Sequence, residues 1–566
     1  MSAPHQSPSA PFSFASAWRE LDDLKSLDEE RAALDLIAAP PLDAPARAAV
    51  EADARALVRR ARALKRRKGV MESFLEEFGL SDAEGLALMC LAEALLRVPD
   101  EETADKLIAE KIKSGNWDDH LGRAGSWLVN AGAFGLMLTG RVVSLSDDVR
   151  ANPEGFLKRL VQRAGEPVIR AAMMQGMRIL GEEFVLGRTI EAAIKRGKGM
   201  VRASAASAFS YDMLGEGARS RADAARYLTS YAGAIDAVAA AAEGRGPELE
   251  SGVSVKLSAL HPRFEARCED RVLAELVPEV LELCRAAAKA GVGLTLDAEE
   301  ADRLVLTLKV LDALAAADDL ADWTGLGLAV QAYQKRSRAV IDHVVELART
   351  RRRRLMVRLV KGAYWDGEIK RAQVQARPDY PVWTTKPATD VAYLACARAM
   401  FAAGAAIYPQ FATHNAHTAV AVQRLADGRP FEFQRLHGMG EALYRAADFS
   451  APVRVYAPVG GHEDLLPYLV RRLLENGANT SFVHSFLDDD VSPDLVAADP
   501  ITRLEGGPKR HPRLPAPAAL YGPSRRNAQG RDLSLAVDRA RFAAPEAIAA
   551  GPIVCGAAAV TSGQTR

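Results

Sequence analysis

The sequence predicts an α/β protein built around a (βα)8 barrel of the TIM type. After about residue 200, eight short runs rich in β-branched or apolar residues recur, and segments rich in Ala, Leu and Arg separate most of them. Such alternation of strands and helices is typical of a parallel sheet. Polar or charged residues stand at the C-terminal end of nearly every run, where a barrel builds its site, and they favour the barrel over an open doubly wound sheet.

The N-terminal part is expected to be helical. Residues 1–17 are rich in Ser, Pro and Ala and predict a disordered tail. In residues 18–200 apolar residues recur at helical spacing, which predicts a helical arm and an all-α domain. The basic run at residues 65–68 could be a nucleic-acid patch, but acidic residues close by favour a solvated helix face.

The barrel is expected at residues 201–490, with a linker or tail at residues 491–566. The tail is rich in Pro, Gly, Ala and Arg. The eight expected strands occupy residues 207–214, 253–260, 293–298, 327–333, 355–365, 408–415, 431–438 and 453–460.

Composition excludes several classes of protein. The 566 residues contain 73 basic and 73 acidic side chains, a balance that argues against a broad basic surface for gripping nucleic acid. No apolar run approaches the length of a membrane span. The five cysteines are scattered without a CxxC pair, which indicates a reducing compartment. We therefore expect a cytoplasmic protein that is soluble or at most peripheral to a membrane.

Polar residues at the strand ends predict the site. Charged side chains inside apolar strands are costly to bury unless they are paired or bound to a ligand. Because such residues converge from many strands, they predict a polar site that holds an anion. They are Asp212, Lys256, Asp297, Gln331, Arg358, Lys361, His414, Arg435 and Tyr456.

One segment after the eighth strand gives a sharper signal. If EDLLPYLVRRLLENGANTSF is helical, then Tyr468, Arg471, Arg472 and Glu475 share one face at spacings i, i+3, i+4 and i+7. A solvated Arg/Glu face is the alternative. The position directly after the eighth strand favours a helix near the barrel mouth, where the guanidinium groups are available to a carboxylate.

Phosphate-binding signals differ from those of a Rossmann domain. Neither GxGxxG opening a helix after a strand nor GxxxxGK[ST] is present. Residues 413–415 instead end a strand just before a helical segment, and residues 361–363 combine a lysine with a close-approach glycine. His414 and His417 have the spacing of a metal pair, but no third ligand is evident, so no metal is expected.

At these residues the sequence closely resembles the proline dehydrogenase module of proline utilization A, a bacterial flavoenzyme family that oxidises L-proline. The motifs that carry the resemblance run through residues 210–484. They include SYDMLGEGA, VSVKLSALHPRFE, LTLDAEEADRL, AVQAYQKR, VRLVKGAYWDGEIKRAQ, QFATHNAHT, FEFQRLHGMGEALY and RVYAPVGGHEDLLPYLVRRLLENGANTSFVH. Residues 103–140 extend the likeness into the helical region.

The resemblance implies a barrel with its last helix over the mouth, a non-covalent FAD, and a role for each matching residue. Lys256, Arg471 and Arg472 would bind the proline carboxylate, with Asp297 beside Lys256. Packing around the pyrrolidine ring would come from Tyr364, Leu436, Tyr456 and Tyr468. Arg358 would approach flavin N5, and Asp212 and Glu216 would pair with the arginines and gate the pocket. The other cofactor-binding residues would be Gln331, Val360, Lys361, Gly362, Ala363, Trp365, Thr384, Lys386, Thr413, His414, Asn415, Gln434 and Glu475.

The implied reaction is oxidation of L-proline to Δ1-pyrroline-5-carboxylate by hydride transfer to flavin N5. The family passes the electrons to a membrane quinone, which implies a peripheral contact with the inner membrane. Two alternatives stay open: a non-catalytic proline- or flavin-sensing interaction module, and oxidation of hydroxyproline. The enzyme is favoured because a sensor need not keep a group that faces N5. The retained residues are Lys256, Asp297, Arg358, Tyr456, Arg471 and Arg472.

The sequence departs from the family pattern in two places. Between Met1 and Pro40 no strand is followed by two helices, so we expect no ribbon-helix-helix domain and no DNA binding. Bifunctional members continue into an aldehyde dehydrogenase with a catalytic cysteine, but Cys555 is a poor match for that nucleophile. We therefore expect most or all of the aldehyde dehydrogenase half to be missing from this chain, which would be a fragment or lack that activity.

Overall fold

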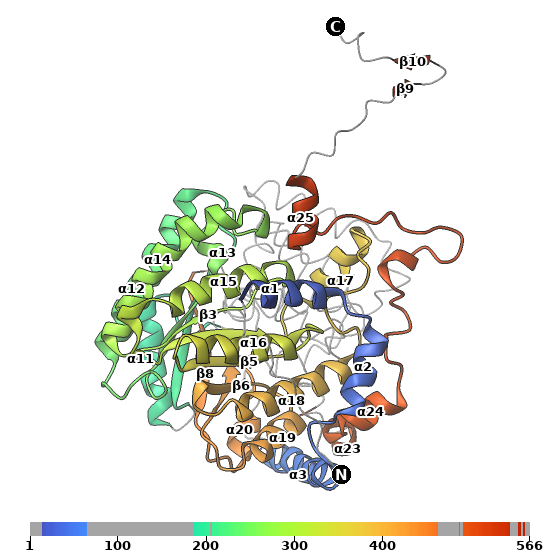
Figure 1. Cartoon of the computed structure of the whole chain (residues 1–566). Coiled ribbons are helices and arrows are strands. Elements are labelled where there is room, and N and C mark those ends of the chain that lie inside the picture. The colour runs from blue at the N-terminus through green and yellow to red at the C-terminus, as the bar shows by residue number, and fades with distance from the viewer. Residues whose placement is uncertain are drawn as a thin grey trace, which may run out of the picture.

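A closed barrel of parallel strands forms the centre of the molecule (Figure 1). The computed structural model describes residues 14–64, 185–203, 206–461, 486 and 491–543, and the backbone of 553–555 and 558–560. Each strand pairs with the next one along the chain, and β1 also pairs with β8, which closes the barrel. The strands are β1 (Ala208–Met213), β2 (Gly252–Val255), β3 (Leu294–Leu296), β4 (Leu326–Gln331), β5 (Leu355–Val360), β6 (Ile407–Ala412), β7 (Glu432–Leu436) and β8 (Val453–Val459).

The structure confirms the predicted barrel, but every strand ends earlier than the sequence suggested, and β2 and β5 end five residues earlier. The second run continues past Val255 as a helical turn, α13 (Leu257–Leu260), whose four side chains are buried. The fifth run stops at Val360 because Gly362 has a φ of +140°. A side chain on Gly362 would also lie 2.4 Å from the ring of Tyr333, so only glycine fits there.

Helices surround the barrel and follow the strands in the expected alternation. A capping box, in which Ser220 and Asp223 each bind the other's backbone N–H, begins the helix after β1. The barrel helices are α12 (Arg221–Ala241), α14 (Glu269–Ala290), α15 (Leu304–Ala315), α16 (Ser337–Thr350), α17 (Trp365–Val374), α18 (Lys386–Ala402), α19 (Ala416–Ala426) and α20 (Glu441–Ala446). Short 3-10 turns lie at η2 (Ala266–Cys268), η3 (Ala301–Arg303), η4 (Asp318–Leu320) and η5 (Gly404–Ala406).

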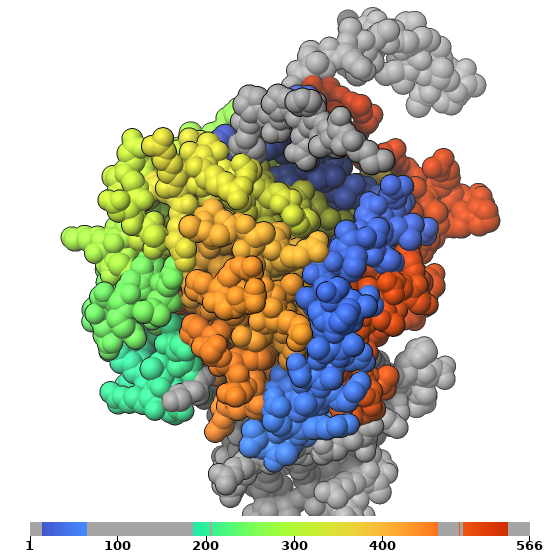
Figure 2. Space-filling view, turned by 60° about the horizontal axis from the view of Figure 1, so that its bottom comes forward, coloured from blue at the N-terminus to red at the C-terminus, as the bar shows by residue number. Residues whose placement is uncertain are grey.

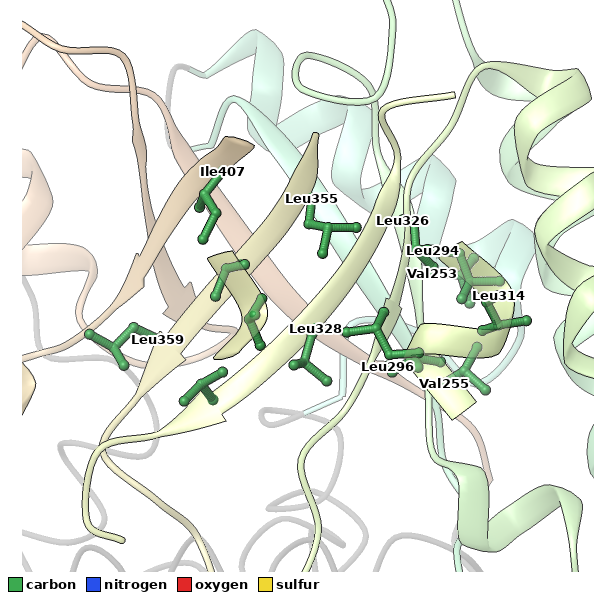
Figure 3. Packing of buried hydrophobic residues seen from close by; sticks show 14 of the residues in the cluster. Val253, Val255, Leu294, Leu296, Leu314, Leu326, Leu328, Leu355, Leu359 and Ile407 are labelled. Atoms are coloured by element: carbon green, nitrogen blue, oxygen red, sulfur yellow. The ribbon is translucent and has the colours of Figure 1, made fainter. Parts of the chain in front are cut away.

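The core lies between the outer face of the barrel and these helices. Alternate strand residues such as Val253 and Val255, or Leu294 and Leu296, carry apolar side chains that are completely or almost completely buried (Figure 3). Leu314 of α15 packs in the same cluster. Because side chains alternate along a strand, the residues between them, Ser254 and Thr295 among others, point into the barrel. The same alternation that builds the core therefore sends polar residues to the interior.

The N-terminal arm is helical in its described part and runs along the outside of the barrel (Figure 2). It consists of α1 (Phe14–Asp23), η1 (Leu24–Ser26), α2 (Glu29–Ala38) and α3 (Ala44–Ala63); α11 (Ile190–Arg202) leads into β1. The first helix begins within the expected 1–17 tail, where the ring of Phe14 stacks on Trp18 at 5.8 Å. Leu57 and Val58 of α3 pack against Leu443 of α20.

The C-terminal segment packs against the barrel and the arm. Its elements are α23 (Pro493–Ala497), α24 (Pro500–Gly506), η6 (Pro517–Ala519) and α25 (Ala536–Ala543), followed by an antiparallel pair, β9 (Ile553–Cys555) and β10 (Ala558–Val560). Ile501 and Leu504 of α24 are buried beside Ala33 of the arm and Trp383. Residues 491–543, expected as part of a linker or tail, are thus tied to the barrel more closely than a free linker would be.

None of the helices that the structure describes has the length and apolar character needed to cross a membrane.

Replacing Leu328 with alanine tests the packing between barrel and helices. Leu328 lies on β4 and is completely buried, so Leu328→Ala should lower the free energy of unfolding by about 2–5 kcal/mol, through lost burial and the cavity left behind. Leu34→Ala, at a side chain that is 51% exposed on α2, is the control and should change stability by less than about 0.5 kcal/mol. Urea titrations would measure both. Equal effects would contradict the assignment of Leu328 to the core.

Candidate active site

Inward-pointing polar residues fill the carboxyl end of the barrel. On β1, Ser210 and Asp212 are two residues apart, and Ser254 and Lys256 have the same spacing on β2 and just after it. A spacing of two puts both residues of a pair on one face of the strand. Asp297 follows β3 directly, so three neighbouring strands deliver charged groups to one place.

Lys256 lies at the centre of this group. Its Nζ lies 2.6 Å from Asp212 Oδ1, 3.2 Å from Asp297 Oδ2 and 3.3 Å from the hydroxyl of Tyr456 on β8. The Tyr456 hydroxyl also donates to Asp297 Oδ2 at 2.6 Å. Because an ammonium group has three protons, these three partners occupy all of its donor positions. The sequence-predicted residues Asp212, Lys256, Asp297 and Tyr456 are therefore brought together.

Arg358 of β5 joins the group from the opposite side of Asp297. One guanidinium nitrogen donates to Asp297 Oδ1 at 2.7 Å, and the other lies 2.9 Å from Ser210 Oγ and 3.0 Å from Ser254 Oγ. The guanidinium carbon lies 5.1 Å from the centre of the Tyr456 ring. Arg358 Nε is buried and has no hydrogen-bond partner among the described residues.

The four charged groups of this cluster balance one another. Burial raises the pKa of the Asp212 carboxyl, and the neighbouring Asp297 raises it further. Burial opposes ionisation of Asp297 as well, but Lys256 and Arg358 outweigh it, so the pKa of Asp297 is lowered. Burial alone would lower the pKa of Lys256, but Asp212, Tyr456 and Asp297 hold it well above its usual value. Lys256 therefore stays charged.

A second cationic group follows β5. Lys361 hydrogen-bonds to Asp390 Oδ1, and Lys386 Nζ lies 2.9 Å from Asp390 Oδ2, so two ammonium groups share one carboxylate. Burial lowers the pKa of Lys361 to about 8, whereas these two lysines hold the pKa of Asp390 below its usual range. The excess positive charge suits a phosphate group.

The segment that ends β6 has a different arrangement from the one expected. Asn415 caps helix α19, because its Oδ1 accepts the backbone N–H of Thr418 at 2.9 Å. Thr413 Oγ1 accepts the N–H of Asn415 at 3.1 Å. His414 Nε2 accepts the N–H of Leu436 at 3.1 Å, which leaves the proton of a neutral ring on Nδ1. Thr413 and Asn415 are thus held by neighbouring residues of the chain, and His414 is held by the end of β7.

The remaining described residues lie around the same end of the barrel. Gln331 Oε1 accepts the N–H of Ala363 at 3.3 Å, and Trp365 Nε1 donates to the carbonyl of Trp383 at 2.8 Å. Gln434 Nε2 donates to Glu432 Oε1 at 2.7 Å, while the buried Gln434 Oε1 has no partner in the described part of the chain. Val360, Tyr364 and Leu436 are half-buried at or next to strand ends, and Glu216 lies on the loop after β1.

One predicted site residue points away from the site, and three residues that the structure places at the site had not been predicted. Arg435 follows Gln434 and therefore points away from the interior; it donates to the carbonyl of Met439 at 3.2 Å. Ser210, Ser254 and Asp390 were missed, although the spacing of two from Asp212 and Lys256 would have found both serines. Four predicted residues lie outside the described residues: Tyr468, Arg471, Arg472 and Glu475.

Comparison with protein families gives two matches. A family model described as proline dehydrogenase matches residues 194–485. A second model, described as the DNA-binding domain of proline dehydrogenase, matches residues 70–184, which lie outside the described residues. The expectation that the chain does not bind DNA was drawn from Met1–Pro40, which this match does not reach, and it stays a prediction.

Known proteins resemble much of the chain. It is 49% identical over 486 residues to the bifunctional protein PutA of Salmonella typhimurium, covering 83% of this chain and 36% of that protein. It is 28% identical over 318 residues to proline dehydrogenase 1 of Bacillus subtilis, covering 55% of this chain and 92% of that protein. A crystal structure of a Bradyrhizobium japonicum PutA variant matches with a TM-score of 0.71 and 48% identity, over 92% of this chain and 52% of that one. The chain thus spans about a third of the Salmonella relative and about half of the crystallised one.

Asp297→Asn tests the balance of the central cluster. The variant leaves Lys256 and Arg358 without their shared anion and should lower the free energy of unfolding by about 3–5 kcal/mol at pH 7. Because the pKa of Asp297 is lowered in the folded state, its contribution is complete above the ordinary value of 3.8 and is lost as the pH falls below it. The difference from the parent should therefore shrink in acid.

Urea titrations at several pH values would measure this difference. Asp236→Asn, at an exposed carboxylate on α12, is the control and should change little. A loss no larger than that of the control would show that Asp297 does not hold the two cations.

Proposed function

Since the chain belongs to the proline dehydrogenase family, we propose that it oxidises L-proline to Δ1-pyrroline-5-carboxylate with a non-covalent FAD. The observation that carries the proposal is the buried cluster of Lys256, Asp297, Arg358 and Tyr456 at the carboxyl end of the barrel. Barrel enzymes carry their active sites at this end. The matching motifs indicate that the substrate is L-proline, and the cluster contains a charged lysine that can bind its carboxylate.

The proposed substrate site lies beside Lys256. Its ammonium group would bind the proline carboxylate in exchange for one of its present hydrogen-bond partners, and Tyr456 would pack against the ring. The described charges of the cluster already balance, so a further anion calls for further cations. Arg471 and Arg472 would supply them, while Tyr364, Leu436 and Tyr468 would complete the apolar wall. Asp212 and Glu216 would pair with these arginines and gate the pocket.

The residues present fit a flavin nucleotide. The cationic group of Lys361 and Lys386 suits a pyrophosphate. Two buried polar atoms, Arg358 Nε and Gln434 Oε1, have no partners among the described residues and could bind the polar edge of a ring. When bound, FAD would accept the hydride from the ring carbon next to the proline nitrogen.

The chain's own residues would orient the reactants. Asp297 holds Lys256 and Arg358 on its two oxygens, so the group that binds the carboxylate and the group proposed to face flavin N5 keep a constant separation. Lys256, Asp297 and Arg358 are buried and Tyr456 is half-buried, which limits the access of water. The residues proposed to hold the rest of the cofactor are Gln331, Val360, Ala363, Trp365, Thr384, Thr413, His414, Asn415 and Glu475.

The proposal extends to the fate of the electrons. The resemblance to proline utilization A supports a quinone acceptor, reached by a peripheral contact of a cytoplasmic protein with the inner membrane. The chain covers 36% of the bifunctional Salmonella relative. An aldehyde dehydrogenase activity is therefore not proposed for this chain, but only for a longer protein of which it would be a part.

A visible spectrum tests the proposed function. The purified chain supplied with FAD should be yellow, and anaerobic L-proline should bleach the flavin absorbance, because the substrate reduces the cofactor. D-Proline is the control and should bleach it far more slowly. If the chain takes up no FAD, the assignment as a flavoenzyme is wrong, and a non-catalytic role is favoured. Faster bleaching by 4-hydroxyproline would move the assignment to that substrate.

Lys361→Met tests the cofactor site. The variant keeps the apolar stem but removes charge-assisted hydrogen bonds worth about 1.5–3 kcal/mol, so FAD should bind about 10- to 150-fold more weakly. Lys370→Met, at an exposed lysine on α17, is the matched control. Quenching of flavin fluorescence would give both dissociation constants. Equal affinities would show that Lys361 does not bind the cofactor.

A further inference from the structure

The loop at residues 375–385, between α17 and α18, lies against the segment that follows β4. Trp383 N donates to the carbonyl of Tyr333 at 2.8 Å, and Lys335 N donates to the carbonyl of Pro381 at 3.1 Å. The loop leads into Lys386, which shares Asp390 with Lys361. The loop therefore delivers Thr384 and Lys386, both proposed cofactor ligands, to the cationic group after β5.

Glu29 of the N-terminal arm binds this loop, although 355 residues separate it from Thr384. Its carboxylate is completely buried. Oε1 accepts the backbone N–H of Thr384, and the Thr384 hydroxyl lies 2.8 Å from Oε1 and 2.9 Å from Oε2. From the C-terminal segment, His511 N donates to the same hydroxyl at 2.8 Å. Thr384 is thus held from two sides by segments outside the barrel.

Charges around Glu29 make this contact more than a single hydrogen bond. Asp379, on the same loop, accepts two hydrogen bonds from Arg510 at 2.8 and 2.6 Å and the backbone N–H of Glu29 at 3.2 Å. Lys335 Nζ lies 3.4 Å from Asp379 and donates to the carbonyl of Leu27. Two acidic and two basic side chains therefore neutralise one another between the arm, the barrel and the C-terminal segment. They are Glu29, Asp379, Lys335 and Arg510.

A second buried ion group fastens the start of the loop to the same two segments. Lys25 Nζ of the arm lies 2.6 Å from both Asp302 and Asp532. Arg377 of the loop lies 2.8 Å from Asp302 and 3.3 Å from Asp532. The loop is thus held near both ends, at Arg377 and at Thr384. Figure 1 shows α2 of the arm beside α24 of the C-terminal segment.

We propose that Glu29 is a positioning residue for the cofactor site. Together with the C-terminal segment it fixes the 375–385 loop in its binding conformation before the cofactor arrives, so that Thr384 and Lys386 need no ordering when it binds. Preorganisation of this kind raises affinity by lowering the entropy lost on binding. The inference rests on the proposed function, because it assumes that FAD occupies this site.

Glu29→Ala in the full chain tests the proposal, with Glu30→Ala as the matched control. Glu30 is the next residue of α2 and is exposed. Loss of the charged acceptor should weaken FAD binding by the apoprotein about 10-fold or more, whereas the control should stay within about twofold. At saturating FAD, kcat and the KM for proline should equal those of the parent. Hydrogen exchange of the apoprotein should become faster at Trp383 and Thr384 in Glu29→Ala alone.

Glu29→Gln gives an independent reading if the alanine variant fails to fold. Its amide oxygen can still accept the Thr384 N–H and its nitrogen can donate to the hydroxyl, so FAD affinity should lie between those of the parent and the alanine variant. Parent-like FAD affinity and exchange in every folded Glu29 variant would overturn the proposal while leaving the proposed function intact. A parent chain that binds no FAD would instead overturn the proposed function, and loop exchange would still report whether Glu29 orders the loop.

Discussion

The interior of the barrel depends on one carboxylate, that of Asp297. One oxygen binds Arg358, and the other accepts from Tyr456 and Lys256, so a single side chain after β3 joins groups from three other strands, β5, β8 and β2. Buried ion pairs add little to stability, because desolvation offsets their attraction. A barrel that needed only stability would fill this space with apolar side chains. The cluster is therefore best understood as a site whose two cations are held at a constant separation.

The sequence predicts the barrel well because burial leaves a regular signal. Strands covered on both faces show as short apolar runs, and polar residues at spacing two mark the inward face, as at Ser254 and Lys256. Strand ends are harder to predict. The run after Val255 has the composition of a strand but folds as the turn α13, since its apolar side chains are buried equally well there. Arg435 was predicted as a site residue because it lies near the end of a strand, but its side chain points away from the barrel interior.

Contacts between distant segments could not be predicted. Nothing in the local pattern around Glu29 or Lys25 distinguishes them from the solvated charges of a surface helix, yet both are completely or almost completely buried. Their partners lie hundreds of residues away, in Thr384 and Asp532. Such pairs depend on where the barrel loops place their counterparts, which composition and periodicity do not encode. The arm and the C-terminal segment thereby become part of the support of the cationic site after β5.

A crystal structure of the chain with FAD and a cyclic carboxylate analogue of proline would test the central claim most directly. The account predicts that the analogue's carboxylate lies within hydrogen-bond distance of Lys256 Nζ, about 2.7–3.2 Å, with the flavin ring beside Arg358 and Asp297 still joining the two cations. An analogue bound away from Lys256, or a flavin bound away from Arg358, would contradict the claim that this cluster is the active site.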